Sequence, residues 1–430
     1  MPTIPHSVTL DKSKCRGCTT CIKHCPTEAI RVRRGKATII SERCIDCGQC
    51  VLVCPYNAKK AVCDPFERLG DFDCTVALPA PSLYGQFHNL GDINIVLQGL
   101  LEIGFDRVYE VASAAETLSA MARRLLQSGT QRPVISAACP ACVRLICQRF
   151  PKLMSHIAPN IAPVELAAIK AREEAARETG LPPERIGVFF ITPCPAKVTA
   201  AHSPVGLEAP VMDGAFSMAD IYVRLLPAMR RITSPAARVT AGLTGVGWAS
   251  SGGEIAAFPH IKSIAVDGID NVAAILEDIE DDKLQDVDFI EIGACTQGCV
   301  GGCLTVENPF VSKMRIKEFA KKLPETAFPE SHSTPELPVR TLPLEANPVH
   351  ILDSDLGEAM DKYRRIEDLL SRLPGLDCSS CGAPSCRSLA EDVVWGFAHE
   401  EDCIFYMRDK MNDEAYLPPP FRKQITDDRE

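Results

Sequence analysis

The stretch that decides the fold spans residues 288–303 and reads DFIEIGACTQGCVGGC. Residues 289–292 are apolar and suit a β-strand, and Cys295, Cys299 and Cys303 follow among glycines. A strand that ends in a glycine-rich loop can present several thiolates to one metal site. Because the chain shows no secretory features, thiolates at this density indicate zinc or iron–sulfur chemistry rather than disulfides.

Composition limits the remaining possibilities. The chain has 430 residues, of which 46% are hydrophobic, as in a globular protein with several domains. A net charge of −10 argues against nucleic-acid binding, and we interpret Arg31, Arg33, Arg34 and Lys36 as a solvated turn. No window of 18 apolar residues and no signal peptide are found, so we expect a cytoplasmic protein without a membrane segment. The 21 cysteines predict metal ligands in a reducing, anoxic compartment.

The N-terminal region carries a duplicated cysteine motif. The pattern CxxCxxCxxxCP occurs twice, with its cysteines at Cys15, Cys18, Cys21, Cys25, Cys44, Cys47, Cys50 and Cys54. In such pairs the first three thiolates bind one 4Fe-4S cube and the fourth binds the other. We therefore assign Cys15, Cys18, Cys21 and Cys54 to one cluster, and Cys44, Cys47, Cys50 and Cys25 to the second. The alternative is a pair of zinc knuckles. The region, residues 1–74, resembles a bacterial two-cluster ferredoxin.

Residues 75–322 show an α/β pattern in which three short apolar strands each end just before a cysteine. These strands are predicted at residues 134–136, 188–191 and 289–292, and further strands at residues 76–78 and 107–111. Helices are predicted at residues 93–103, 115–127 and 165–179, and the last two are expected to end at Gly129 and Gly180. If the strands are parallel, their loops open on the carboxyl edge of one sheet. The four cysteines expected to converge there are Cys139, Cys194, Cys295 and Cys299.

These loops resemble the signatures of the FeFe hydrogenases, TSCCP, MPCxxK and MACxxGCxxGGG. The chain reads SAACP at residues 136–140, TPCPAK at residues 192–197 and GACTQGCVGGC at residues 293–303. The resemblance implies an H-cluster, in which a 4Fe-4S cube is joined to a diiron subsite with CO and cyanide ligands. It further implies that Cys139, Cys194 and Cys295 bind the cube, that Cys299 bridges to the diiron subsite, and that Lys197 contacts a cyanide.

The departures from the family pattern concern proton transfer. Ala138 replaces the cysteine that passes protons to the diiron bridge, and Thr192 replaces the methionine of MPC. No match is found for the glutamates of the usual proton path, because the corresponding helix reads Met-Ala-Arg-Arg at residues 121–124. A positioned acid or base contributes about 10²–10⁴-fold in rate. We therefore expect slow turnover, as in the sensory hydrogenases, which also carry alanine here.

The C-terminal part holds a further four-cysteine motif. Prolines are frequent in residues 323–350, which we interpret as an extended linker. In residues 351–430 a helix over 356–373 precedes Cys378, Cys381, Cys386 and Cys403. The DCSSCGAPSC core resembles the 4Fe-4S domain of corrinoid iron–sulfur and Rnf proteins, with structural zinc as the alternative. The five cysteines left without a ligand role are Cys63, Cys74, Cys142, Cys147 and Cys303.

The predicted fold is an α/β hydrogenase-like domain with an N-terminal α+β ferredoxin-like domain and a small, mostly helical C-terminal Fe–S domain. The predicted function is slow H2 oxidation or H2 sensing at an H-cluster, with Cys299, Lys197 and Ala138 at the catalytic site. Three accessory 4Fe-4S clusters would pass electrons to a redox or signalling partner, and hydrogenase maturation enzymes would supply the diiron subsite. The alternative is an electron-transfer or cluster-delivery protein without that subsite.

Overall fold

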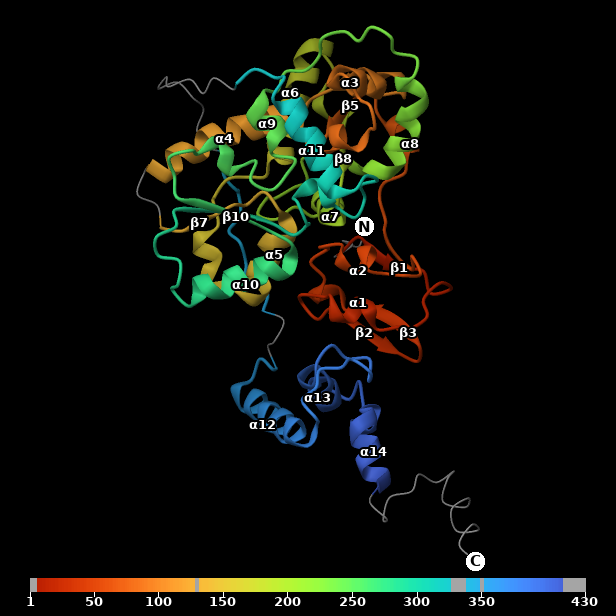
Figure 1. The fold of residues 1–430 in the computed structure, drawn as a ribbon, viewed down its shortest axis with the longest axis vertical. Coiled ribbons are helices and arrows are strands. Elements are labelled where there is room, and N and C mark those ends of the chain that lie inside the picture. The colour runs from red at the N-terminus through yellow and green to blue at the C-terminus, as the bar shows by residue number, and fades with distance from the viewer. Residues whose placement is uncertain (1–5, 128–130, 326–337, 349–351, 413–430) are drawn as a thin grey trace, which may run out of the picture. The chain divides into compact units, whose positions relative to one another are not determined.

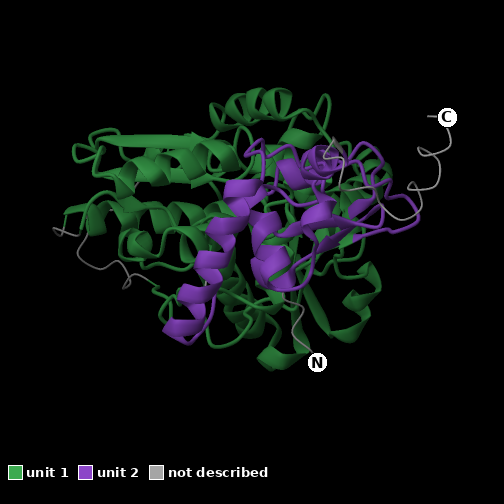
Figure 2. Ribbon diagram, turned by 90° about the horizontal axis from the view of Figure 1, so that it is seen from below, with its two compact units in different colours: residues 1–9, 44–52, 60–348 green, residues 10–43, 53–59, 349–430 purple. Residues whose placement is uncertain are grey.

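The computed structural model describes residues 6–127, 131–325, 338–348 and 352–412 (Figure 1). The chain forms two compact units, which Figure 2 shows in different colours. The first unit comprises residues 1–9, 44–52 and 60–348, and the second comprises residues 10–43, 53–59 and 349–430. The duplicated cysteine motif therefore contributes residues to both units.

A four-stranded parallel sheet forms one part of the first unit, with the strand order β6-β5-β8-β9. Its strands are β5 (Cys74–Pro79), β6 (Arg107–Val108), β8 (Ile186–Thr192) and β9 (Gly214–Ser217). Every residue of β5, β8 and β9 is buried. Continuous apolar strands of this kind are typical of parallel sheets that are covered on both faces.

A second, three-stranded sheet has the order β10-β11-β7, and its strands are also parallel. They are β7 (Val134–Ile135), β10 (Ser263–Asp267) and β11 (Phe289–Gly293). The parallel arrangement is confirmed, but the expectation of a single sheet is wrong, because β8 lies in the other sheet. Short apolar strands resemble one another in sequence, so the pattern cannot say which of two sheets each one joins.

Helices surround both sheets. They are α2 (Gln49–Leu52), α3 (Ile93–Glu102), α4 (Val111–Gln127), α5 (Pro140–Arg149), α6 (Pro163–Thr179), α7 (Pro195–His202), α8 (Met218–Met229), α9 (Leu243–Gly247), α10 (Ile269–Glu280) and α11 (Pro309–Ala320). Proline at the first helical position starts α5, α6, α7 and α11, since its missing N–H would have no partner there. Gly180 ends α6 with φ 71°, as the sequence predicts. The helix stop expected at Gly129 lies outside the described residues.

Two hydrophobic clusters fill the first unit. One surrounds β5 and β8 and contains Tyr84, Phe189 and Phe190, which are essentially inaccessible to solvent. The other surrounds β7 and β11 and includes Ile45, which comes from the second N-terminal cysteine motif. Residues 44–52 thus belong to the core of the unit that carries the two parallel sheets.

The second unit combines an antiparallel hairpin with a helical C-terminal region. The hairpin is β2 (Ile30–Arg33) with β3 (Lys36–Ile39), preceded by α1 (Thr20–Lys23). The C-terminal helices are α12 (Leu356–Arg372), α13 (Cys386–Val394) and α14 (Ile404–Asn412). Ile366 and Leu369 of α12 pack with Ala390 and Val394 of α13. The strands β1 (Val8–Leu10) and β4 (Lys59–Ala61) pair with each other.

The prediction of a solvated turn is confirmed for Arg34 and Lys36, which are exposed, but it is wrong for Arg31 and Arg33. Arg31 is only 5% exposed, and its Nε lies 2.7 Å from Asp392 Oδ2 of α13. Arg33 Nη2 lies 2.7 Å from the same oxygen. The sequence alone does not show this pairing, because the acidic partner Asp392 lies about 360 residues away along the chain.

Residues 338–348, from the predicted linker, run along the first unit. Ile161 N donates to Pro338 O, Arg340 N donates to Pro159 O, and Asn347 N donates to Cys147 O. The remaining prolines of the predicted linker fall largely in residues 326–337, outside the described part of the chain. Within the described ranges, none of the helices combines the length and apolar character needed to cross a bilayer.

Candidate functional site

The four cysteines expected at the central site all follow strand ends in the first unit. Cys139 and Cys194 are the N-cap residues of α5 and α7, which begin directly after β7 and β8. Cys295 lies two residues beyond β11, and Cys299 opens the 3₁₀ helix Cys299–Gly301. Two strands of one sheet and one strand of the other therefore deliver these side chains.

The four central cysteines are half-buried, and their thiols interact electrostatically. Burial and the charges of Cys194, Cys299 and Cys139 raise the pKa of Cys295 well above the usual value. Burial also raises the pKa of Cys194 to about 12. Four thiolates that repel one another need positive charge to become ligands together, and an iron–sulfur cube supplies it. The donor set therefore fits the expected cluster.

Lys197 brings a cation into this group. Its side chain is buried, and Nζ donates to Ala138 O at 3.2 Å. Its charge lowers the pKa values of Cys139, Cys194 and Cys299. Lys197 thus connects the loop around Ala138 with the ligand cysteines.

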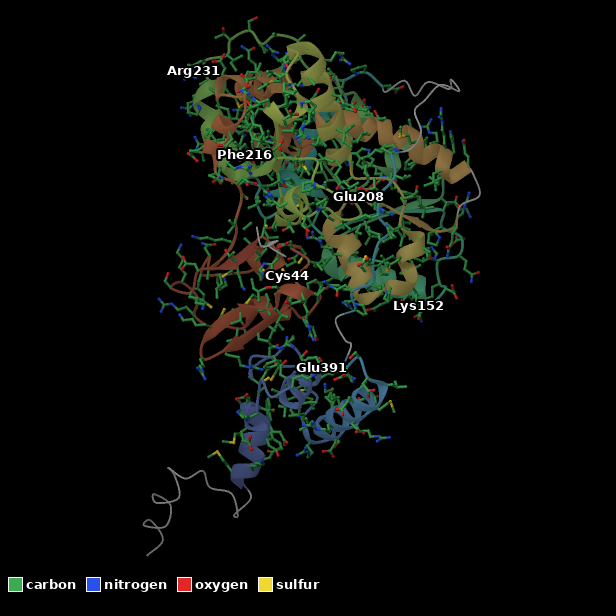
Figure 3. All side chains as sticks on the ribbon, turned by 180° about the vertical axis from the view of Figure 1, so that it is seen from behind. Cys44, Lys152, Glu208, Phe216, Arg231 and Glu391 are labelled. Carbon is green, nitrogen blue, oxygen red and sulfur yellow. The ribbon has the colours of Figure 1, made fainter. Side chains whose placement is uncertain are left out.

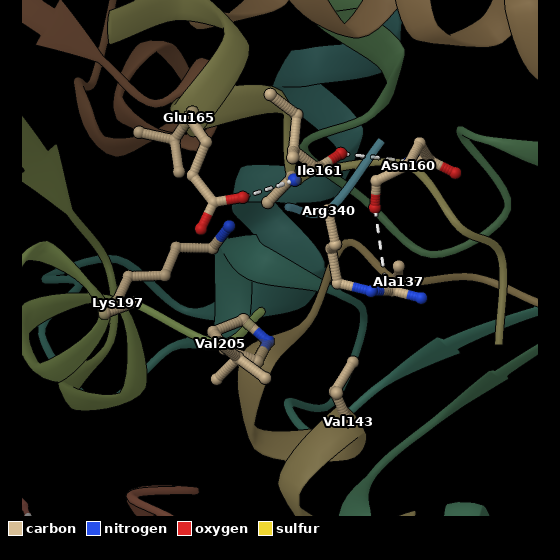
Figure 4. A pocket seen from close by; sticks show the side chains of 12 residues that line it. Ala137, Val143, Asn160, Ile161, Glu165, Lys197, Val205 and Arg340 are labelled. Atoms are coloured by element: carbon tan, nitrogen blue, oxygen red, sulfur yellow. Dashed lines mark hydrogen bonds between the residues drawn. The ribbon is translucent and has the colours of Figure 1, made fainter. Parts of the chain in front are cut away.

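A cavity opens beside Lys197 (Figure 4). The ammonium of Lys197 and the carboxylate of Glu165 point toward each other there, and Arg340 comes from the segment 338–348. Glu165 Oε2 accepts a hydrogen bond from Ala162 N at 2.7 Å, and burial raises the pKa of the Glu165 carboxyl. Most of the other lining side chains are small or apolar, so the cavity can hold a small group beside the Lys197 ammonium.

A buried pair of carboxyl groups lies behind the Ala138 loop. Ser136 Oγ donates to Glu254 Oε2 at 2.6 Å and lies 3.3 Å from Ala138 N, from which it accepts. Burial, with the nearby charge of Glu291, raises the pKa of Glu254 to about 8. Glu291 in β11 accepts hydrogen bonds from the backbone N–H groups of Gly252, Glu254 and Ile255. At neutral pH Glu254 therefore holds a proton one hydroxyl group away from Ala138.

Family comparison agrees with this geometry. Residues 73–213 and 232–303 match the family described as iron only hydrogenase large subunit, C-terminal domain. The matched residues include all four central cysteines and the strands of both sheets except β9. These residues are similar to the large-subunit domain of the iron-only hydrogenases. Residues 7–55 of the same chain match a 4Fe-4S dicluster domain, and residues 373–405 match an Fe–S cluster family.

Individual relatives of the hydrogenase domain are distant. The chain is 24% identical over 227 residues to iron hydrogenase 1 of Clostridium pasteurianum, a match that covers 46% of this chain and 40% of that protein. Two variants of the [FeFe]-hydrogenase HydA1 from Chlamydomonas reinhardtii, one of them an apo form, are 14% identical. Their TM-scores are 0.48 and 0.49, and each match covers 66% of this chain and 97% of the other.

The cysteines of the dicluster motif are divided between the units. Cys15, Cys18, Cys21 and Cys54 all line one cavity of the second unit, as expected for a common cluster. Cys25 also lies in the second unit, whereas Cys44, Cys47 and Cys50 lie in the first. The two halves of the repeat share one local feature, since Cys25 Sγ accepts from Ala29 N and Cys54 Sγ from Ala58 N, both at 3.2 Å.

Asp46 holds the loop of Cys44 against α5 and α7 of the same unit. Figure 3 labels Cys44. The Asp46 side chain is fully buried and accepts hydrogen bonds from Ser7 N at 3.1 Å and from Thr199 Oγ1 at 2.6 Å. Arg144 Nη1 of α5 lies 3.6 Å from Asp46 Oδ2. Because Thr199 belongs to α7 and Cys194 caps that helix, one carboxylate connects the loop of Cys44 with the element that starts at Cys194.

The C-terminal cysteines approach one another in the second unit. The charges of Cys403 and Cys378 both raise the pKa of Cys381, although burial has the larger effect. Cys386 begins α13, and its backbone N–H donates to Asp377 Oδ1 at 2.6 Å. Four thiols in one small domain fit the match to an Fe–S cluster family, and structural zinc stays the alternative.

The cysteines without a predicted ligand role differ in their surroundings. Cys142 hydrogen-bonds Cys139 and thereby lowers the pKa of Cys139 to about 6. A Cβ atom added to Gly48 would lie 2.7 Å from Cys303 Sγ, so Cys303 touches the loop between Cys47 and Cys50. Cys63, Cys74 and Cys147 have pKa values raised by burial, which makes them inert as free thiols.

Sequence reasoning missed Glu254 and Glu291. The available signal was a glutamate at the centre of the apolar strand FIEIG, since an ionisable residue is rarely buried without a partner. Only the fold brings Glu254, Glu291 and Ser136 together, because they come from three separate segments.

Proposed function

We propose that this chain binds H2 at an H-cluster on Cys139, Cys194, Cys295 and Cys299, and that it oxidises or senses H2 slowly. One observation carries the proposal, namely that the buried Lys197 acts on Cys139, Cys194 and Cys299 with its charge while its ammonium donates to Ala138 O. In a bound H-cluster the diiron subsite supplies the chemistry that splits and forms H2. Cys299 would bridge the cube to it, and Lys197 would orient it through a cyanide ligand.

Proton handling would differ from that in the usual family pattern. Ala138 carries no proton, so the side chain at the relay position cannot act as an acid or base. The Ser136 hydroxyl and the protonated carboxyl of Glu254 are the nearest groups behind the loop that can exchange one. Glu291 would keep that proton on Glu254 by repelling a second charge. Transfer through this longer route supports slow rather than fast turnover.

Electron transfer would use the accessory clusters. At 59 mV per tenfold, seven decades of proton activity place the proton/H2 couple at about −410 mV at pH 7. Plant-type ferredoxin clusters lie at about −400 mV, so clusters of this kind exchange electrons with H2 almost reversibly. A redox or signalling partner, in the cytoplasm of an anaerobe, would receive the electrons. Maturation enzymes would insert the diiron subsite.

A second candidate function is electron transfer or cluster delivery without a diiron subsite. Ala138 and Thr192 favour it, because both replace side chains that the family places around that subsite. The Lys197 ammonium favours the first proposal, since a buried cation beside a cavity suits an anionic cyanide ligand.

Infrared spectroscopy separates the two. The full chain is purified anaerobically after co-expression with maturation enzymes, or is loaded with a synthetic diiron complex. Spectra are then recorded before and after H2 is added. Carbonyl and cyanide bands that shift with H2 are expected.

A silent spectrum from protein with a full iron content would leave the second candidate. Lys197→Met provides the matched control, because it keeps the length of the side chain and removes its charge. The expected result is a shift of the cyanide bands, or their loss, with the cube retained in the electron paramagnetic resonance (EPR) spectrum. Unchanged cyanide bands would remove the assigned role of Lys197.

A further inference from the structure

The second unit joins the C-terminal cysteine domain to the first ferredoxin site through one backbone contact. Val32 N of β2 donates to Gly382 O at 2.8 Å, and Gly382 directly follows Cys381. Arg33 Nη1 donates to Cys381 O at 2.8 Å. The hairpin therefore donates hydrogen bonds to the carbonyl oxygen of Cys381, a predicted cluster ligand, and to that of the next residue.

The same hairpin reaches the first ferredoxin site on its other side. Val32 lines the cavity that Cys15, Cys18, Cys21 and Cys54 share. Val32 pairs with Ala37 across the hairpin, and Ala37 N donates to Cys15 Sγ at 3.4 Å. A short path of backbone contacts thus runs from Cys381 through Gly382 to Val32, across the hairpin to the facing residue Ala37, and on to Cys15.

Buried charge holds this contact in place. Asp392 Oδ2 receives Arg31 and Arg33 at 2.7 Å each, and both the Arg31 and Asp392 side chains are about 6% exposed. Glu28, beside the hairpin, accepts hydrogen bonds from Ser385 and Ser388 at the start of α13. The guanidinium of Arg43 lies 5.9 Å from the ring centre of Trp395. Such buried pairs fix one geometry, because a partner left alone would keep an uncompensated charge.

Gly382 is required at the centre of the contact. Its φ of +82° favours glycine, and a Cβ atom there would lie 1.9 Å from Val32 O. Any side chain would have to push the two backbones apart. The approach of the two segments is therefore as close as backbones allow.

We propose that this contact is an electron bridge, through which the C-terminal cluster exchanges electrons with the cluster on Cys15, Cys18, Cys21 and Cys54. One electron leaves the cluster on one side and reduces the cluster on the other by one electron, with no bond formed or broken. A one-electron donor or acceptor of low potential completes the exchange outside the protein. The C-terminal domain is then the port of the chain for its redox partner. The inference deepens the electron-transfer part of the proposed function.

The test uses the full chain, purified anaerobically with its iron–sulfur clusters but without a diiron subsite, and reduced with dithionite. In the unaltered protein the EPR signal of the C-terminal cluster is broadened by its coupling to the first ferredoxin cluster. Gly382→Ala separates the backbones, so a distinct signal of an isolated cluster is expected at unchanged iron content. Electron delivery from the C-terminal cluster to the ferredoxin clusters, followed after a pulse of reductant, slows in parallel.

Gly396→Ala is the matched control. Gly396 has a similar φ of +78° but no atom within 4 Å of an added Cβ, so it carries the same backbone strain without the clash. This variant keeps the coupled spectrum. If Gly382→Ala loses a cluster or fails to fold, Asp392→Asn removes the charge that Arg31 and Arg33 share and gives the same expected uncoupling.

Three outcomes would overturn the bridge. They are an isolated C-terminal signal in the unaltered protein, a coupled signal that survives both Gly382→Ala and Asp392→Asn, and zinc in place of iron at the C-terminal cysteines. None of them depends on H2. A silent infrared spectrum together with coupled clusters would reject the H-cluster and keep the bridge.

Discussion

Two of the central cysteines, Cys194 and Cys295, differ from two accessory cysteines of the second unit, Cys54 and Cys378, in the groups that act on their thiols. Burial raises the pKa values of Cys194 and Cys295, and few hydrogen-bond donors oppose it. Burial alone would raise the pKa of Cys54, but hydrogen bonds from the backbone N–H groups of Ala58, Lys59 and Tyr56 lower it. Ser380 lowers the pKa of Cys378, which lies close to solvent. Burial and neighbouring thiols therefore disfavour the thiolates of Cys194 and Cys295, whereas hydrogen bonds favour those of Cys54 and Cys378.

This difference separates two kinds of chemistry. An enclosed site keeps water away from a reactive centre and depends on the metal to neutralise its thiolates. An open site with hydrogen-bonded sulfurs can exchange electrons with a partner at the surface. In the proposed function the hydrogenase-like domain would carry the reaction, and the second unit would transfer electrons.

Cys299→Ser is expected to have the largest effect, because it removes the one thiolate that both the cube and the diiron subsite need. H2 turnover should fall below detection, and the carbonyl and cyanide bands should disappear. EPR signals of the accessory clusters should persist. Cys303→Ser is the control, since Cys303 lies nearby without a predicted ligand role, and an equal loss in that variant would contradict the assignment.

Glu254→Gln should lower turnover by about 10²-fold, the low end for removal of a positioned acid. In the unaltered protein turnover should fall as the pH rises through about 8, where Glu254 loses its proton, and the variant should lose this dependence. The raised pKa also means that the native state binds this proton more tightly than the unfolded chain. Between about pH 4.5 and 8 this carboxyl therefore lowers stability as the pH rises, and Glu254→Gln removes the effect.

A matched control for this prediction is Glu208→Gln, because Glu208 is an exposed carboxylate of the same unit. It should leave both the turnover and its pH profile unchanged. A pH profile that is the same in Glu254→Gln and in the unaltered protein would exclude Glu254 from the proton route.

Ala138→Cys should raise H2 turnover by about tenfold or more, because it restores a side chain that carries a proton at the relay position. The measurement is H2 evolution by protein with a complete H-cluster, judged by its infrared bands. Ala138→Ser is a useful companion, since a hydroxyl is a much weaker acid than a thiol and should give a smaller gain. No gain in a fully assembled Ala138→Cys variant would show that the relay is not the limit.

Asp46→Asn should destabilise the first unit by about 2 kcal/mol, the scale of a hydrogen bond to a charged group. The loop of Cys44 would lose its charged contact with Arg144 and Thr199. Anaerobic denaturant unfolding measures the change. Asp278→Asn breaks only an exposed ion pair and should change stability by less than about 0.5 kcal/mol. Equal effects would mean that Asp46 does not anchor the loop.

Much of the fold could be predicted from local patterns. Proline and glycine mark the ends of α5, α6 and α7, and α12 follows the apolar spacing and ends before Pro374. The strand predicted over residues 107–111 is shorter, because α4 already begins at Val111. The assignment of β7 and β8 to one sheet failed, since pairing between strands depends on contacts distant in sequence.

The sequence alone determined which residues can bind metal, because the spacing of cysteines is local and only certain residue types provide soft ligands. It also determined the family, through three loops in order. Only the tertiary structure decided that Arg31 and Arg33 pair with the buried Asp392 and that Glu254 accepts a hydrogen bond from Ser136. Such groups reveal their role only when burial removes water and brings a partner from another part of the chain.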